Sequence, residues 1–82
     1  MKLLVNVYVP AIAAHYDILI PANLRIRNIA NMIATTVEEL SDHLYVASGE
    51  ECLCFVDKQI LFRQNATLED YGVQNGSQLV MM

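Results

Sequence analysis

The sequence predicts an α+β domain in which a mixed β-sheet packs against one main α-helix. Two runs with a period of two occupy residues 3–9 and 15–20, and this period is typical of β-strands. Apolar residues then recur at spacings of three and four between residues 25 and 40, which predicts an amphipathic helix. Further short runs with a period of two lie at residues 52–61 and 79–82. The predicted order is β-β-α-β-β-β within a single domain, residues 1–82.

The first two predicted strands are joined by a few residues around positions 11–14, which favours an antiparallel hairpin. Pro10 ends the first strand and Pro21 ends the second, because proline has no N–H to donate to a ladder. One side of the alternation along the two strands is apolar and consists of Leu3, Val5, Val7, Val9, Tyr16, Ile18 and Ile20.

The predicted helix begins near Arg25, with Asn23 as its expected N-cap and Leu24 packed beside the cap. Its charges lie at the unfavourable ends: Arg25 and Arg27 are near the N-terminus, whereas the helix dipole prefers anions there. Two glutamates, Glu38 and Glu39, likewise lie near the C-terminus. We interpret these charges as solvated; the alternative is that their placement serves a partner. The apolar stripe consists of Ile26, Ile29, Ile33, Val37 and Leu40.

Turn signals divide the second half of the chain. Ser48–Gly49 marks a turn in a connection of undefined structure between residues 41 and 51. Residues 52–61 then predict a strand, a turn at Asp57–Lys58 and a short returning strand, with Leu53 and Phe55 on one face and Cys52 and Cys54 on the other.

The last part of the chain combines one helical turn with a final strand. Thr67 is placed to cap the helical turn and Gly72 to stop it. Asn75–Gly76 predicts a tight turn before the last strand. Burying an apolar side chain contributes roughly 1.5–3 kcal/mol, so the predicted core can offset the ordering entropy. That core consists of Leu3, Val5, Val7, Ile18, Ile20, Ile26, Ile29, Ile33, Leu53, Phe55, Leu68, Leu79 and Met81.

The composition limits the classes of partner. Apolar residues make up 55% of the chain and charged residues 17%, so some apolar side chains are expected at the surface as a binding patch. The net charge of −4 and the five scattered basic residues argue against nucleic acid, because phosphate binding needs clustered Lys and Arg. No stretch approaches the ~20 apolar residues of a membrane span, so no direct membrane insertion is expected.

The stretch MKLLVNVYVPAIAA has some features of a signal peptide. We expect a mature N-terminus instead, because Asn6 and Pro10 interrupt the apolar run and cleavage would delete a strand. Cys52 and Cys54 are too few for a disulfide scaffold, and alternate residues of a strand, ~7 Å apart, have poor disulfide geometry. We therefore expect free thiols and a cytoplasmic, reducing location.

No catalytic residue, metal ligand or cofactor is predicted. His15 and His43 belong to no cluster with ligand spacing, and the three glycines form no phosphate-binding loop. Ser41, Asp42 and His43 are sequence neighbours, which does not make a triad. Cys54 has no evident base nearby, so we interpret it as a small apolar residue.

The order of elements is that of the β-grasp fold, and the residues resemble ubiquitin over almost the whole chain. "LCFVDKQI" is similar to a strand, turn and Lys-Gln-Leu of ubiquitin, and "TLEDYGVQNGSQLV" is similar to its Thr-Leu-Ser-Asp-Tyr and the strand beyond. Ile26, Ile29 and Ile33 repeat the spacing of ubiquitin's helix. The chain departs from ubiquitin in the longer stretch at residues 41–51.

Within that superfamily, the chain is most similar to the bacterial YukD/EsaB group of small stand-alone ubiquitin-like proteins. "YGVQNGSQL" resembles that group's ending, Gly-(Ile/Val)-x-Asn-Gly-(Asp/Ser)-x-Leu. The resemblance implies an accessory role in a type VII (ESX/Wss-like) secretion system of Gram-positive bacteria. A similar domain forms the cytosolic N-terminal part of a membrane channel component of that machinery.

Ubiquitin and the sulfur carriers act through a flexible tail that ends in Gly-Gly. Here Val80, Met81 and Met82 fall inside the predicted last strand, so conjugation and sulfur transfer are not expected. Two alternatives stay open: a modifier or sulfur carrier whose tail is missing from this sequence, and the ubiquitin-like domain of a larger secretion-channel membrane component.

The outward face of the sheet is the candidate partner-binding site. Cys54 and Val80 match positions of the patch on which ubiquitin is most often recognised. We expect this face to bind secretion-machinery proteins or a second copy in a homodimer, as a non-enzymatic interaction module; the alternative is an ordinary apolar surface. The residues predicted to form the patch are Leu4, Asn6, Cys52, Cys54, Val80 and Met82.

Overall fold

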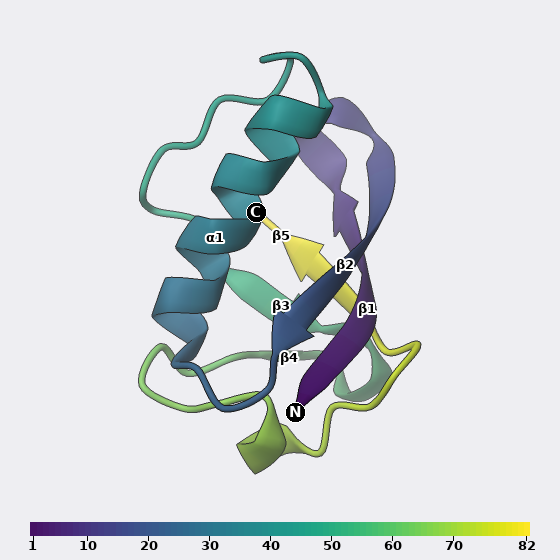
Figure 1. The fold of residues 1–82 in the computed structure, drawn as a ribbon, viewed down its shortest axis with the longest axis vertical. Helices are drawn as coiled ribbons and strands as arrows, with labels where there is room; N and C mark the ends of the chain where they lie inside the picture. Colours follow the sequence, from purple (N-terminus) through teal and green to yellow (C-terminus); the bar gives the residue numbers. More distant parts are fainter.

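One α-helix packs across a five-stranded mixed sheet in the computed structural model, which describes all 82 residues (Figure 1). Three 3₁₀ turns lie at Pro10–Ile12, Val56–Lys58 and Glu69–Tyr71. The predicted α+β order, β-β-α-β-β-β, is confirmed. In chain order, the strands and the α-helix are β1 (Lys2–Val9), β2 (Ala14–Pro21), α1 (Ile26–Leu40), β3 (Leu53–Phe55), β4 (Ile60–Leu61) and β5 (Gln78–Met81).

The strands lie in the order β2-β1-β5-β3-β4, so the last strand of the chain is at the centre of the sheet. β1 pairs antiparallel with β2 and parallel with β5, while β3 pairs antiparallel with β5 and β4. The turn before β5 sets this position. Gly76 has a φ of 86°, and its N–H donates to the Leu4 carbonyl at 2.8 Å. The side-chain oxygen of Asn75 accepts the N–H of Leu4 at 2.8 Å, so both turn residues bind β1.

The predicted β1–β2 hairpin is confirmed. Its register is continuous, from Lys2 opposite Pro21 to Val9 opposite Ala14. Pro10 begins the connecting 3₁₀ turn, where its missing N–H costs no ladder bond. The hairpin places alternate side chains of both strands on the face that α1 covers, which is the pattern read from the sequence.

The start of α1 differs from the prediction. Arg25, not Asn23, occupies the N-cap, and no side chain bonds the first N–H groups of the helix. The N–H of Ile26 instead donates to the carbonyl of Ala66 at 2.8 Å. Leu24 is exposed. The free helix donors are therefore satisfied by backbone from a distant part of the chain, which local capping signals do not reveal.

The core lies between α1 and the sheet and contains all but one of the predicted core residues. The exception is Ile18, which is half-buried because it lies on the edge strand β2. Leu40, the last member of the predicted stripe, is 61% exposed where α1 ends. The apolar residues buried in addition to the predicted core are Val9, Ala22, Ala30, Ala34, Val37, Phe62 and Val73.

The carboxylate of Glu38 bonds to two residues of the connection that returns from α1 to β3. Its Oε1 accepts the N–H of Ala47 at 2.8 Å, and its Oε2 lies 3.2 Å from Nδ1 of His43. These bonds lower the pKa of Glu38 below its ordinary value. Glu38 is half-buried, so its charge is only partly solvated. Arg25 is exposed, as the solvated-charge interpretation expects, and its guanidinium also donates to the carbonyl of Asn65.

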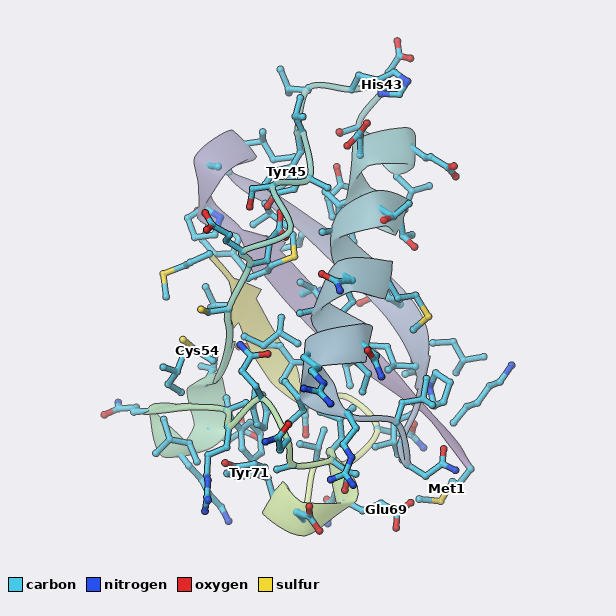
Figure 2. All side chains as sticks on the ribbon, turned by 90° about the vertical axis from the view of Figure 1, so that its left-hand side faces the viewer. Met1, His43, Tyr45, Cys54, Glu69 and Tyr71 are labelled. Carbon is cyan, nitrogen blue, oxygen red and sulfur yellow. The ribbon has the colours of Figure 1, made fainter.

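The carboxylate of Glu51 bonds to three other residues of this connection. Its side chain is buried, and its carboxylate accepts the hydroxyl of Tyr45 at 2.8 Å (Figure 2 shows Tyr45 within the connection). The same carboxylate accepts the N–H groups of Ser48 and Gly49 at 2.6 and 3.1 Å. The turn predicted at Ser48–Gly49 thus folds around a buried anion.

The helical turn before β5 is capped as predicted. Oγ1 of Thr67 accepts the N–H of Asp70 at 3.3 Å, and Oδ2 of Asp70 accepts the N–H of Thr67 at 3.0 Å. Gly72 follows with a φ of 69°, the left-handed conformation that ends such a turn. This reciprocal pair fixes the approach of the chain to β5.

Candidate docking face of the sheet

The outward face of the sheet, on the side away from α1, carries one row of aligned side chains. The strand registers place Cys54 of β3 opposite Val80 of β5, and Val80 opposite Tyr8 of β1. Leu61 of β4 lies opposite Cys54 on its other side. We call these four residues the central row. Figure 2 shows the Cys54 side chain pointing away from α1.

The central row is an apolar strip that contains no charged side chain. It crosses four neighbouring strands, which at ~4.8 Å per strand spacing gives a length of ~14 Å. Tyr8, Cys54 and Val80 are half-buried, and Leu61 is 59% exposed. Covering such a strip with a partner removes apolar surface from water, which favours association.

Cys52 and Met82 extend the central row at one side. Two backbone hydrogen bonds join them, from the N–H of Cys52 to the Met82 carbonyl at 2.8 Å and in return at 2.9 Å. Met82 is 63% exposed and Cys52 is half-buried. Cys52 and Cys54 are both free thiols.

Asn6 belongs to a polar group rather than to the apolar strip. Its amide donates to Oδ1 of Asp17 at 3.0 Å, and its Oδ1 lies 2.9 Å from Nδ1 of His15. The His15 ring also lies against Tyr8, with 4.5 Å between ring centroids. His15 thus has local partners in Asn6 and Tyr8, and the second histidine has its own in Glu38.

Leu4 lies apart from the other predicted site residues. It is four residues along β1 from Tyr8, a distance of ~13 Å in a strand, and it lies opposite Leu19 of β2. Both leucines are about half exposed, at 47% and 56%. The structure therefore brings together four of the predicted site residues, Cys52, Cys54, Val80 and Met82.

Sequence reasoning missed two members of the central row, Tyr8 and Leu61. Tyr8 alternates with the core residues just as Asn6 does, but only the β1–β5 register shows that it lies beside Val80. Leu61 follows Gln59, which has a φ of 54°, so strand alternation cannot be continued across that turn. A correct prediction of the register between β1 and β5 would have identified Tyr8.

The outward face offers apolar side chains, two thiols and the amide and imidazole of the Asn6 group. The structure contains no pocket, and no three His, Cys, Asp or Glu side chains converge to hold a metal ion. The one α-helix is not long and apolar enough to cross a membrane.

Two secretion-system domains are among the solved structures with this fold. The ubiquitin-like domain of the Mycobacterium tuberculosis type VII secretion system protein EccD1 has a TM-score of 0.79 at 15% identity, over 100% of this chain and 98% of that one. The EccD5 ubiquitin-like domain from Mycobacterium xenopi has a TM-score of 0.69 at 20% identity, over 100% of this chain and 93% of that one.

The ubiquitin of Caldiarchaeum subterraneum shares the fold as well, with a TM-score of 0.69 at 15% identity over 99% of this chain and 91% of that one. These likenesses confirm the predicted ubiquitin-like β-grasp fold. No curated protein matches the sequence. The family model described as "WXG100 protein secretion system (Wss), protein YukD" matches residues 4–81. The match leaves out only residues 1–3 and 82 of the chain, and the chain therefore belongs to the YukD family.

Proposed function

We propose that this chain is a non-enzymatic ubiquitin-like docking module that serves as an accessory or regulatory component of a type VII secretion system. Membership of the YukD family supports the link to secretion. The fold likeness to the EccD1 and EccD5 domains agrees with it. The free thiols of Cys52 and Cys54 support the cytoplasm, a reducing compartment, as the place of action.

The proposed mechanism is docking without a chemical step: the central row is buried against a protein of the secretion machinery. One observation carries this proposal, the direct alignment of Tyr8, Val80, Cys54 and Leu61 across four strands. Burial of apolar surface contributes ~25 cal/mol per Å², and the half-buried members are already ordered by the sheet. Binding therefore costs little additional side-chain entropy in the row.

A double substitution in the central row tests this mechanism. Cys54→Asp with Val80→Asp places two carboxylates in the strip, and their desolvation opposes burial against a partner. Co-purification with secretion-machinery proteins of the same organism should then be lost. Met32→Asp, an apolar-to-acidic change at an exposed position of α1, should leave it intact. Retained binding by a folded double variant, checked by circular dichroism, would exclude this face.

The EccD likeness favours a second candidate, in which this chain is the ubiquitin-like domain of a larger secretion-channel membrane component. The two similar secretion structures are themselves described as ubiquitin-like domains of EccD proteins. The native reading frame distinguishes the candidates: membrane-spanning segments after Met82 would support the larger component. A Gly-Gly shortly after Met82 would instead support a modifier or sulfur carrier.

A further inference from the structure

β2 leaves a whole strand edge without a partner. It is eight residues long and lies at the end of the sheet, where it pairs with β1 alone. The strand at the opposite edge, β4, has only two residues. A long open edge is a template for another chain, because its N–H and C=O groups remain unpaired.

The hydrogen-bond pattern identifies the backbone groups on this open edge. The N–H of Ala22 donates to the Met1 carbonyl at 2.9 Å, so the even-numbered residues of β2 bond to β1. In β1, the N–H of Asn6 points away from β2 and donates to the Ser77 carbonyl at 3.0 Å. This agrees with the alternation, because successive residues of a strand direct their backbone groups to opposite sides. The residues whose backbone groups face the open edge are therefore His15, Asp17 and Leu19.

β2 has few of the usual protections of an edge strand. Its pairing with β1 is continuous, without a bulge, and residues 14–20 contain no lysine and no proline. The one charge in this stretch is Asp17, which accepts a hydrogen bond from Asn6 at 3.0 Å. Pro21 limits the open edge only at its end.

We propose that two copies of this chain pair through β2, antiparallel, with Tyr16 of one copy opposite Tyr16 of the other. Two-fold symmetry then places His15 of each copy opposite Asp17 of the other. Both residues present backbone groups on the open edge, so each pair exchanges N–H···O=C bonds. The two sheets join into one, with both helices on the same side.

Charge selects this register over its neighbours. A pairing centred on Asp17 would place two carboxylates directly opposite each other, which is destabilising. A pairing centred on Ile18 would place Asp17 opposite an apolar residue. With Tyr16 at the centre, each Asp17 faces an imidazole of the second copy. The existing bonds of Asn6 to His15 and Asp17 then connect both cross-strand pairs in one polar network.

The helix-side face of β2 favours the same pairing. Tyr16 and Ile18 are half-buried at the margin of the core. In the dimer the two Tyr16 side chains form a non-hydrogen-bonded pair, and Ile18 lies opposite Ala14 of the second copy. Cross-strand aromatic and apolar pairs of this kind stabilise a sheet. The outward faces stay open, so the dimer displays two central rows, and its existence does not depend on the proposed function.

Sedimentation equilibrium at concentrations up to ~1 mM, the range for weak association, tests the dimer. The unmodified chain should show a monomer–dimer equilibrium. Asp17→Lys and His15→Glu should each weaken it about tenfold, because each change counts twice in a two-fold dimer. The double variant His15→Glu/Asp17→Lys should restore it. Asp57→Lys, the same charge change at an exposed turn beside β4, should leave it unchanged.

Three results would overturn the proposal while circular dichroism shows folded protein. One is a monomer at every concentration. Another is a dimer that tolerates both Asp17→Lys and His15→Glu. The last is a dimer that Cys54→Asp abolishes and Asp17→Lys does not, since such a dimer would form through the outward face.

Disulfide trapping tests the register, in a background with Cys52→Ser and Cys54→Ser. Tyr16→Cys should cross-link readily, because opposite Cα atoms in a non-hydrogen-bonded pair are ~4.5 Å apart, within the disulfide range. Ile18→Cys should not, because the two positions would be offset by four residues, ~13 Å along the strands. Efficient cross-linking by Ile18→Cys, or none by Tyr16→Cys, would overturn the pairing centred on Tyr16.

Discussion

The hydroxyl of Tyr45 donates to Oε2 of Glu51 at 2.8 Å, and this bond closes the connection between α1 and β3. Burial by itself raises the pKa of Glu51, but hydrogen bonds from the Ser48 N–H and the Tyr45 hydroxyl outweigh it and hold the pKa below the ordinary value of 4.5. Burial and the adjacent carboxylate raise the pKa of Tyr45 to about 12. At neutral pH, Glu51 is therefore an ionised acceptor and Tyr45 a protonated donor.

Glu51→Gln should destabilise the domain. The carboxylate accepts hydrogen bonds from Tyr45, Ser48 and Gly49, whereas an amide has one acceptor oxygen and leaves at least one of these donors unpaired. The free energy of unfolding should fall by ~1–3 kcal/mol in urea denaturation. The exposed neighbour supplies the control, since Glu50→Gln should change stability by less than ~0.5 kcal/mol. Equal effects of the two changes would contradict this role.

Acid should remove part of the stability through Glu38 and Glu51. Folding lowers the pKa of both carboxyl groups, so each stabilises the fold above its unfolded-state pKa. That contribution disappears as the pH falls through the folded-state pKa. The advantage of the unmodified chain over Glu51→Gln should therefore be complete near ~pH 7 and decline below ~pH 4. Urea titrations across this range measure it, and an advantage undiminished at ~pH 2 would be inconsistent with an ionised Glu51.

Gly76→Ala should destabilise the domain only through the conformational cost of its backbone. Gly76 has a φ of 86°, and a Cβ there would meet no atom within 4 Å, so there is no steric contact to relieve. The left-handed conformation costs a residue with a Cβ ~1–2 kcal/mol. Gly76→Asn should cost less, because asparagine adopts this conformation more readily. For a domain of this size, ~1 kcal/mol lowers the Tm by roughly 4–8 °C. An unchanged Tm in the Gly76→Ala variant would contradict a conformational cost at this position.

Thr67→Ala and Asp70→Ala should show coupled effects, because each side chain accepts the N–H of the other residue. Each single change should cost ~0.5–2 kcal/mol, the usual loss for a helix cap. The loss in the double variant should differ from the sum of the single losses. Thr67→Ser, which keeps a hydroxyl acceptor, should retain most of the stability. Additive single effects would argue against a reciprocal cap.

The strands and the helix could be predicted because their signals are local. Alternation within Lys2–Val9 and the stripe from Ile26 to Val37 each follow from the geometry of one element. The N-cap prediction at Asn23 failed because the donor of Ile26 finds the Ala66 carbonyl, far away in sequence. The structure of the connection likewise depends on a carboxylate at its far end, that of Glu51, which bonds to Tyr45, Ser48 and Gly49.

The candidate site could be predicted only in part, for the same reason. The position of Cys54 and Val80 on the outward face could be predicted from alternation together with the resemblance to ubiquitin. Tyr8 joins them only through the parallel register of β1 with β5, which Gly76 and Asn75 set at the turn. Leu4 was expected in the patch because alternation along its strand places it on the outward face, but a shared face does not specify position along the strand.

The reactivity of the Cys54 thiol tests the proposed docking face most directly, because this native side chain lies in the middle of the central row. In a Cys52→Ser background, the rate of alkylation of Cys54 is measured with and without the bound secretion-machinery protein. We predict that binding slows alkylation several-fold, while a thiol introduced by Met32→Cys on α1 keeps its rate. An unchanged rate at Cys54 in a fully formed complex would contradict docking through this face.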